Sequence, residues 1–186
     1  MKQAVAPMTH SGYRIARSLI SEERIQAKVK EMGAELARDY EGKKPLLVSI
    51  LKGSFVFMAD LTRAMAIPHE IDFMVVKSYE GTASTGTVRI LEDLHQSIEG
   101  RHVILVEDIV DSGLTLEYMR RNLITRHPAS LEVVTLLDKA EARSVDVRVE
   151  RVGFTIPDEF VVGYGLDYNQ LYRNLPFLAV LDPDQA

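Results

Sequence analysis

The stretch from Val103 to Thr115 reads VILVEDIVDSGLT. It begins inside an apolar run, residues 102–106, of the kind found in strands that are covered on both faces. Small and acidic residues follow, and then a helical pattern that stops before Pro128. Because ligands of open α/β sheets bind at the carboxyl ends of such strands, the stretch predicts a buried strand, a binding turn and a helix.

Similar apolar runs alternate with helical patterns along the rest of the chain. Residues 21–40 repeat apolar positions at offsets of three and four, with Ser21 as a cap and Gly42 just past the end. This alternation is typical of an α/β fold with a parallel sheet. The predicted strands are 45–51, 71–77, 102–106, 131–137, 160–162 and 177–181, and the predicted helices are 21–40, 55–65 and 116–124.

Residues 78–87, SYEGTASTGT, are small and polar without apolar periodicity. They predict a long loop, and long loops inside compact domains are often lids or binding loops. A plain surface hairpin is the alternative.

The composition restricts the function classes. The chain has 186 residues, a net charge of −5 and no cysteine, which predicts one domain. The missing cysteines exclude disulfides, thiolate zinc sites, iron–sulfur clusters and a cysteine nucleophile. The acidic balance argues against a broad nucleic-acid surface. The five histidines lack paired metal spacing, and no nucleophile-elbow motif is present.

The first 14 residues contain no apolar segment of signal-peptide length, and no run of 18 apolar residues occurs. We therefore expect a cytoplasmic protein with no membrane partner.

Ser112, Gly113 and Thr115 are small, so backbone amides there can approach an anion closely. The N-terminus of the following helix adds a favourable dipole, which makes the turn a candidate phosphate site. It is not a Walker loop, because the glycine–lysine pattern is absent. A simple helix cap is the alternative.

Three carboxylates, Glu107, Asp108 and Asp111, stand beside this turn. They would repel a phosphate unless they serve sugar hydroxyls or hold a hard cation. Mg²⁺ commonly joins one or two carboxylates to substrate phosphates. The turn therefore predicts a sugar phosphate and Mg²⁺.

Residues 107–115 resemble the phosphoribosyl-pyrophosphate signature of the type I phosphoribosyltransferases. Further blocks resemble the hypoxanthine-guanine branch of that family, over about residues 45–181. The blocks are 51–54 (LKGS), 78–79 (SY), 136–139 (LLDK) and 160–168 (FVVGYGLDY).

The resemblance implies a parallel core sheet flanked by helices, with a small subdomain called the hood. It implies one domain over residues 1–186, with the core at about 40–160 and the hood formed by the N-terminal segment and about 160–186. The implied reaction is purine salvage: transfer of 5-phosphoribosyl from phosphoribosyl pyrophosphate to hypoxanthine and/or guanine, which gives IMP or GMP and pyrophosphate. A homodimer or homotetramer is implied as well.

The resemblance also implies residue roles. The turn holds the 5′-phosphate, and Asp111 accepts or shuttles the proton of the purine imidazole ring as the catalytic acid–base group. Lys139 donates to the six-oxo group, which a lysine can do because it has donors and no acceptor. By itself, a lysine in the stretch 138–141 (DKAE) is more readily a solvated surface charge. The implied phosphoribosyl contacts are Glu107, Asp108, Ser112, Gly113, Leu114 and Thr115.

Phe160 is implied to stack on the base with Ile109 on the opposite face, although core packing is the ordinary role of a strand phenylalanine. Val161 is implied to contact the base edge, and Asp167 to lie at the purine and on the metal side. The implied pyrophosphate contacts are Lys52, Gly53 and Arg173, with a cis peptide between Leu51 and Lys52; the implied metal ligands are Glu107, Asp108 and Asp167; and the implied closing loop starts at Ser78 and Tyr79.

The chain departs from some relatives at Leu114, where they have lysine, and at Gly165 and Gln170. These departures leave base preference open. Two other functions remain: a phosphoribosyltransferase that uses xanthine, and a non-catalytic regulator that senses phosphoribosyl pyrophosphate and binds nucleic acid.

Overall fold

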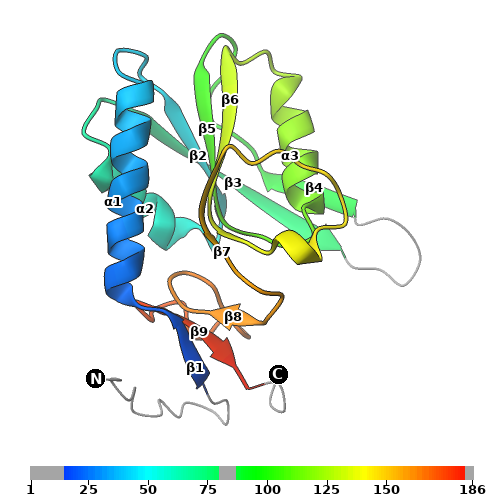
Figure 1. The fold of residues 1–186 in the computed structure, drawn as a ribbon. Coiled ribbons are helices and arrows are strands. Elements are labelled where there is room, and N and C mark those ends of the chain that lie inside the picture. Colours follow the sequence, from blue (N-terminus) through cyan, green and yellow to red (C-terminus); the bar gives the residue numbers. More distant parts are fainter. Residues whose placement is uncertain (1–14, 80–86, 183–186) are drawn as a thin grey trace.

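The computed structural model describes residues 15–79 and 87–182. A central six-stranded sheet has the strand order β4-β3-β2-β5-β6-β7 (Figure 1). All neighbouring strands are parallel except β4, which pairs antiparallel with β3. The strands are β2 (Leu46–Leu51), β3 (Glu70–Tyr79), β4 (Thr87–Glu92), β5 (His102–Val110), β6 (Ser130–Asp138) and β7 (Arg151–Thr155). The predicted α/β class with a mostly parallel sheet is confirmed.

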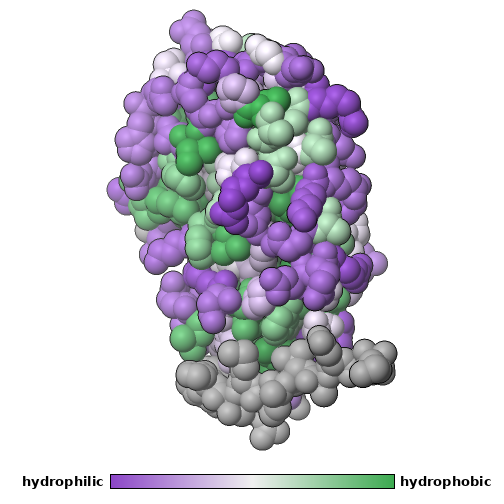
Figure 2. Space-filling model, turned by 90° about the vertical axis from the view of Figure 1, so that its left-hand side faces the viewer, coloured by the Kyte–Doolittle hydropathy of each residue, from purple (hydrophilic) through white to green (hydrophobic). Residues whose placement is uncertain are grey.

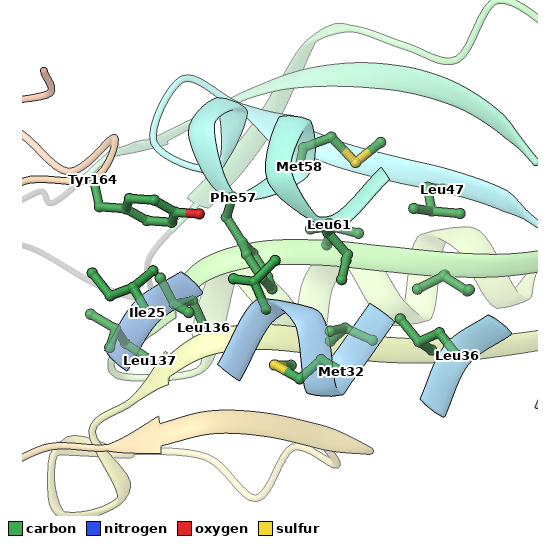
Figure 3. Packing of buried hydrophobic residues seen from close by; sticks show 14 of the residues in the cluster. Ile25, Met32, Leu36, Leu47, Phe57, Met58, Leu61, Leu136, Leu137 and Tyr164 are labelled. Atoms are coloured by element: carbon green, nitrogen blue, oxygen red, sulfur yellow. The ribbon is translucent and has the colours of Figure 1, made fainter. Parts of the chain in front are cut away.

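Helices cover both faces of this sheet. Helices α1 (Glu22–Asp39) and α2 (Phe55–Ala64) lie on one face, and α3 (Leu114–Ile124) lies on the other (Figure 1). The α1–α2 face encloses a core in which Phe57 and Leu61 of α2 pack near Ile25 and Leu36 of α1 (Figure 3). A second apolar cluster lies between α3 and the opposite face. Because both faces are covered, the central strands are apolar throughout.

Helix α1 shows how local sequence sets an element. The hydroxyl of Ser21 accepts a hydrogen bond from the amide of Arg24 at 3.4 Å, so this residue caps the helix as predicted. Ile25, Val29 and Leu36 are buried on one face of the helix. The sequence period therefore fixes which side of α1 meets the sheet.

A second, small antiparallel sheet has the order β1-β9-β8. Its strands are β1 (Ile15–Ile20), β8 (Val161–Val162) and β9 (Leu178–Leu181), and it lies beyond the carboxyl ends of the central strands (Figure 1). Ile15 is paired with Leu181, so segments from both ends of the described chain form this sheet. We use the name hood for this sheet and its connections.

Several sequence predictions need correction. Ser78 and Tyr79 do not begin a loop, because they end β3, where Tyr79 is paired with Thr87 of β4. Strand β5 does not end at Val106 but continues to Val110, which places Glu107 and Asp108 within the strand. The remaining part of the predicted loop, residues 80–86, and the N-terminal residues 1–14 lie outside the described residues.

Figure 2 shows the side of the molecule on which α1 lies, where hydrophilic residues alternate with smaller groups of hydrophobic residues. The exposed hydrophobic residues include Phe55 on α2, of which 44% is exposed. Within the described part of the chain, no helix is both long and apolar enough to span a membrane.

Candidate functional site

The turns that follow β2 and β5 enclose a cavity of about 230 Å³ at the carboxyl edge of the central sheet. Lys52 and Gly53 line one side, and residues 107–113 line the other. These two strands are neighbours in the sheet, so their ends meet at one edge. This is the position at which parallel sheets bind ligands.

The turn between β5 and α3 has the shape of an anion site. Gly113 precedes the helix with φ of +83°, in the left-handed region. A Cβ atom at Gly113 would lie 3.0 Å from Val147 Cγ1, so both conformation and space favour glycine. The amide of Ser144 donates to the carbonyl of Ser112 at 2.9 Å and holds the turn from outside. The helix N-terminus therefore points toward the cavity with its favourable dipole.

Leu114 and Thr115 are the first residues of α3 rather than loop residues. Thr115 lines the cavity, whereas Leu114 lines an open groove on the outer side of α3 together with Tyr118. The side chain of Leu114 therefore lies outside the phosphate cavity, although its backbone belongs to the turn.

Glu107 and Asp108 are adjacent acids on β5, and both line the cavity. Burial raises the pKa of Glu107 well above its ordinary value, and the charge of Asp108 raises it further. Burial also raises the pKa of Asp108 to about 6, against the lowering effect of its backbone hydrogen bonds and Arg173. No lysine or arginine of the described residues forms an ion pair with either carboxylate. A buried acid and a half-buried acid that lack an ion-pair partner favour binding of a cation or of hydroxyl donors.

The donor set fits Mg²⁺ bound together with a substrate. Glu107 and Asp108 offer hard carboxylate oxygens, which this ion prefers. Among the described residues, no three acidic or histidine side chains lie close enough to hold a metal by themselves. Mg²⁺ usually keeps several waters and binds through one or two carboxylates plus phosphate or sugar oxygens. The site is therefore suited to a metal that arrives with a phosphorylated ligand.

A second cavity of about 330 Å³ adjoins the first and reaches the hood. The two cavities share five lining residues, among them Asp108 and Asp111. A ligand could therefore place its anionic part in the first cavity and a further group in the second. The shared residues are Lys52, Gly53, Asp108, Ile109 and Asp111, and the second cavity adds Lys139, Phe160, Val161, Leu166, Asp167 and Arg173.

The aromatic side of the second cavity is open. Phe160 is 48% exposed, so it is not the core residue that strand phenylalanines usually are. The edge of Tyr168 packs on it, with ring centroids 5.4 Å apart and an interplanar angle of 88°. Ile109 also lines this cavity. A flat ring could stack on Phe160 at low cost, because the phenylalanine already faces the cavity.

Lys139 follows β6 and is buried, with its side chain 8% exposed. Its Nζ donates to Asp111 Oδ2 at 3.0 Å and to Asp158 Oδ1 at 3.1 Å. Burial lowers the pKa of Lys139, but the two carboxylates outweigh this effect and hold it above its ordinary value. The residue is therefore a charged donor inside the cavity and not a solvated surface lysine.

Arg173 closes the hood side. It donates to the carbonyl of Gly165 at 2.7 Å and forms an ion pair with Asp167 at 2.6 Å. The backbone amide of Gln170 supports the pair, because it donates to Asp167 Oδ2 at 2.8 Å. Asp167 is thus already engaged by a guanidinium and an amide, unlike the two acids of β5.

The turn after β2 approaches the acids closely. The peptide bond between Leu51 and Lys52 is cis, which confirms the expectation from the resemblance. A Cβ atom at Gly53 would lie only 1.7 Å from Asp108 Oδ2, so no larger residue fits without moving the acid.

The structure thus gathers the predicted phosphate, pyrophosphate and base residues around two joined cavities, with the side chain of Leu114 outside them. Ser78 and Tyr79 end β3. Sequence reasoning missed Leu166 as a lining residue and Asp158 as the second partner of Lys139. Asp158 precedes the 160–168 block, and no local pattern connects it to a lysine 19 residues earlier.

Comparison with known proteins agrees with this geometry. A family model described as "Phosphoribosyl transferase domain" matches residues 18–169. The hypoxanthine-guanine phosphoribosyltransferase of Bacillus subtilis (strain 168) is 51% identical over 170 residues, which cover 91% of this chain and 94% of that protein. The protein of that name from Mycobacterium avium is 50% identical over 172 residues, covering 89% of this chain and 85% of that protein. A crystal structure of a hypoxanthine phosphoribosyltransferase from Staphylococcus aureus matches with a TM-score of 0.88 and 50% identity, and the match covers 91% of this chain and 93% of that one.

Proposed function

The chain belongs to the phosphoribosyl transferase domain family, and from this membership we infer that it is a purine-salvage enzyme of the hypoxanthine-guanine type. It transfers the 5-phosphoribosyl group of phosphoribosyl pyrophosphate to hypoxanthine and/or guanine. The products are IMP or GMP and pyrophosphate. The bond from the ribosyl carbon to pyrophosphate breaks, and a bond from that carbon to a ring nitrogen of the base forms.

One observation supports this assignment most strongly. The phosphate turn and the slot beside Phe160 are two joined cavities, and Asp111 lines both. The ribosyl carbon of a bound donor would lie between them. A carboxylate at this point can act on the base and on the developing positive charge at once.

Each residue group has a proposed task. The amides of Ser112, Gly113 and Thr115 hold the 5′-phosphate, while Glu107 and Asp108 meet the ribose hydroxyls. Lys52, Gly53 and Arg173 contact the pyrophosphate, for which the planar fork of an arginine is suited. Catalysis then depends mainly on positioning and charge stabilisation, because pyrophosphate is already a good leaving group.

We propose that Mg²⁺ is the cofactor and that Glu107, Asp108 and Asp167 would hold it. When bound, Mg²⁺ neutralises phosphate charge and makes pyrophosphate a better leaving group. Asp167 is also paired with Arg173, so it would share its carboxylate between the guanidinium and the metal.

The base is selected by groups around Phe160. The aromatic ring stacks on the purine with Ile109 opposite, and Val161 contacts the base edge through its backbone. Asp111 takes the proton of the imidazole N–H, and Lys139 donates to the six-oxo oxygen. A lysine cannot accept a hydrogen bond, so it discriminates against the amino group of adenine.

Some features remain proposals by family membership. Residues 1–186 work as one domain, the loop that begins after Tyr79 closes over the site, and the chain forms a homodimer or homotetramer without nucleic acid. Sedimentation of the purified chain would give the oligomeric state.

The decisive experiment mixes the protein with Mg²⁺, phosphoribosyl pyrophosphate and one base at a time, and follows pyrophosphate release and nucleotide formation. We expect turnover with hypoxanthine or guanine, little with adenine, and loss of turnover with a chelator. Turnover highest with xanthine would favour the xanthine-using alternative. Absence of turnover, with tight and salt-sensitive binding of RNA or DNA, would favour the regulator.

A further inference from the structure

Lys139 lies between two carboxylates that differ in their relation to the cavities. Its Nζ is 3.0 Å from Asp111 Oδ2 and 3.1 Å from Asp158 Oδ1. Asp111 lines both cavities, whereas Asp158 is not among the described residues that line either. Asp158 therefore contacts the lysine from outside the space that a base would fill.

The segment that contains Asp158 is fixed at both ends. The amide of Ile156 donates to the carbonyl of Asp138 at 2.9 Å, immediately before the lysine at the end of β6. The amide of Leu181 in β9 donates to the carbonyl of Phe160 at 3.2 Å. The segment 156–160 is therefore held by the central sheet on one side and by the hood on the other. This places the carboxylate of Asp158 at a defined position relative to the lysine.

We infer that Asp158 is a positioning residue that aims the ammonium of Lys139 at the six-oxo oxygen of the base. The inference rests on the proposed function. In that reaction Asp111 has to face the imidazole N–H of the base, so its contact with Lys139 weakens or is shared. Asp158 has no task at the base and can keep its contact throughout.

The donor count supports this role. An ammonium group has three donors. One N–H of Lys139 donates to Asp158, and the two remaining N–H groups are available for the oxo oxygen of the base and for Asp111. Burying an ammonium without a partner is unfavourable, and Lys139 is buried. With Asp158 in place, the lysine remains charged and directed inward after Asp111 turns to the base.

Asp158 itself contributes little to the fold. Its side chain is 61% exposed, and ion pairs with an exposed partner add little to the free energy of unfolding. A substitution there should therefore change the binding of the base without unfolding the protein. The adjacent Glu159 provides a matched control, because its carboxylate pairs with Arg17 in the hood instead of with the lysine.

The test measures KM for hypoxanthine, KM for phosphoribosyl pyrophosphate, kcat and the melting temperature for Asp158→Asn and for Glu159→Gln. For Asp158→Asn we expect KM for hypoxanthine to rise about tenfold, since the hydrogen bond from Lys139 loses its charged acceptor and the asparagine amide oxygen is a weaker one. We expect kcat and KM for the pyrophosphate donor to change by less than about threefold, because those contacts do not involve Asp158. The melting temperature of Asp158→Asn should match that of the wild type. The kinetic constants of Glu159→Gln should match those of the wild type as well.

A second arm introduces Asp158→Asn into a Lys139→Ala background. If Asp158 acts through the lysine, it should have no further effect on KM for hypoxanthine there. An unchanged KM in the single variant, an equal loss in both backgrounds, or a parallel change in both KM values and the melting temperature would each overturn the inference. Failure of the proposed function is seen separately, as a wild-type chain that forms no nucleotide.

Discussion

Gly33 provides a direct test of how α1 and α2 are held together. It is buried in the middle of α1. A Cβ atom added there would lie 2.5 Å from Ala64 Cβ, 2.8 Å from its carbonyl carbon and 2.9 Å from its oxygen. Ordinary contacts of this kind are 3.4–4 Å, so Gly33→Ala would push the end of α2 away by up to about an ångström.

Two effects oppose each other in Gly33→Ala. Helix propensity favours alanine over glycine by about 1 kcal/mol in a helix interior. Forcing an extra methyl group into a packed contact costs about 1–3 kcal/mol, and here two of the three atoms are backbone, which cannot rotate away. We expect the packing cost to exceed the propensity gain and to lower the free energy of unfolding by up to about 2 kcal/mol. For a chain of this size that lowers the melting temperature by up to about 8 °C.

The matched control is Ala34→Gly, at the next and exposed position of the same helix. It should cost about 1 kcal/mol from propensity alone, without any change in packing. Both variants are measured by urea unfolding followed by circular dichroism. If Gly33→Ala were more stable than the wild type by the amount that Ala34→Gly is less stable, the contact between the helices would be soft and the reasoning refuted.

Three further outcomes can be checked. Asp111→Asn should lower kcat by about a hundredfold or more while the nucleotide product still binds, and an unchanged kcat would exclude Asp111 as the acid–base group. Gly53→Ala should displace the carboxylate of Asp108 and raise KM for phosphoribosyl pyrophosphate by about tenfold or more, which steady-state kinetics would detect. The hydrogen bond with Asp72, at 2.9 Å, and then its charge raise the pKa of His95 above its ordinary value of 6.5. This stabilisation is complete below the pKa of His95 in the unfolded chain and is lost as the pH rises through its pKa in the folded chain. The free energy of unfolding should therefore fall above pH 6.5, and His95→Gln should make that fall smaller. Urea midpoints that decline equally with pH in both proteins would contradict this prediction.

Elements defined by neighbouring residues were predictable from the sequence. Helix α1 follows from the Ser21 cap and an apolar period, and both are observed. The turn at residues 111–113 follows from an apolar strand, small residues and a helical pattern in immediate succession. In each case the interactions that stabilise the element are made by residues close to one another in the sequence.

Elements that depend on distant partners were missed or misplaced. Strand β1 gains its order from pairing with β9, about the whole length of the chain away. Strand β7 is short, and Gly153 within it approaches the carbonyl of Leu136 so closely that a Cβ atom would lie 2.6 Å from the oxygen. The five residues of β7 do not indicate that another strand's backbone lies so close to Gly153. The contact between Asp158 and Lys139 was missed for the same reason.

The central strand β5 has two tasks that conflict energetically. Its apolar half, ending at Val106, is fully buried and supports the core on both faces of the sheet. Directly after it come the buried Glu107 and the half-buried Asp108, neither with an ion-pair partner among the described residues, which lowers the stability of the folded chain. A sequence optimised for stability alone would not keep both acids there. Their cost is offset only when a cation or hydroxyl donors bind, and a rigid central strand is the element best able to hold them ready for that ligand.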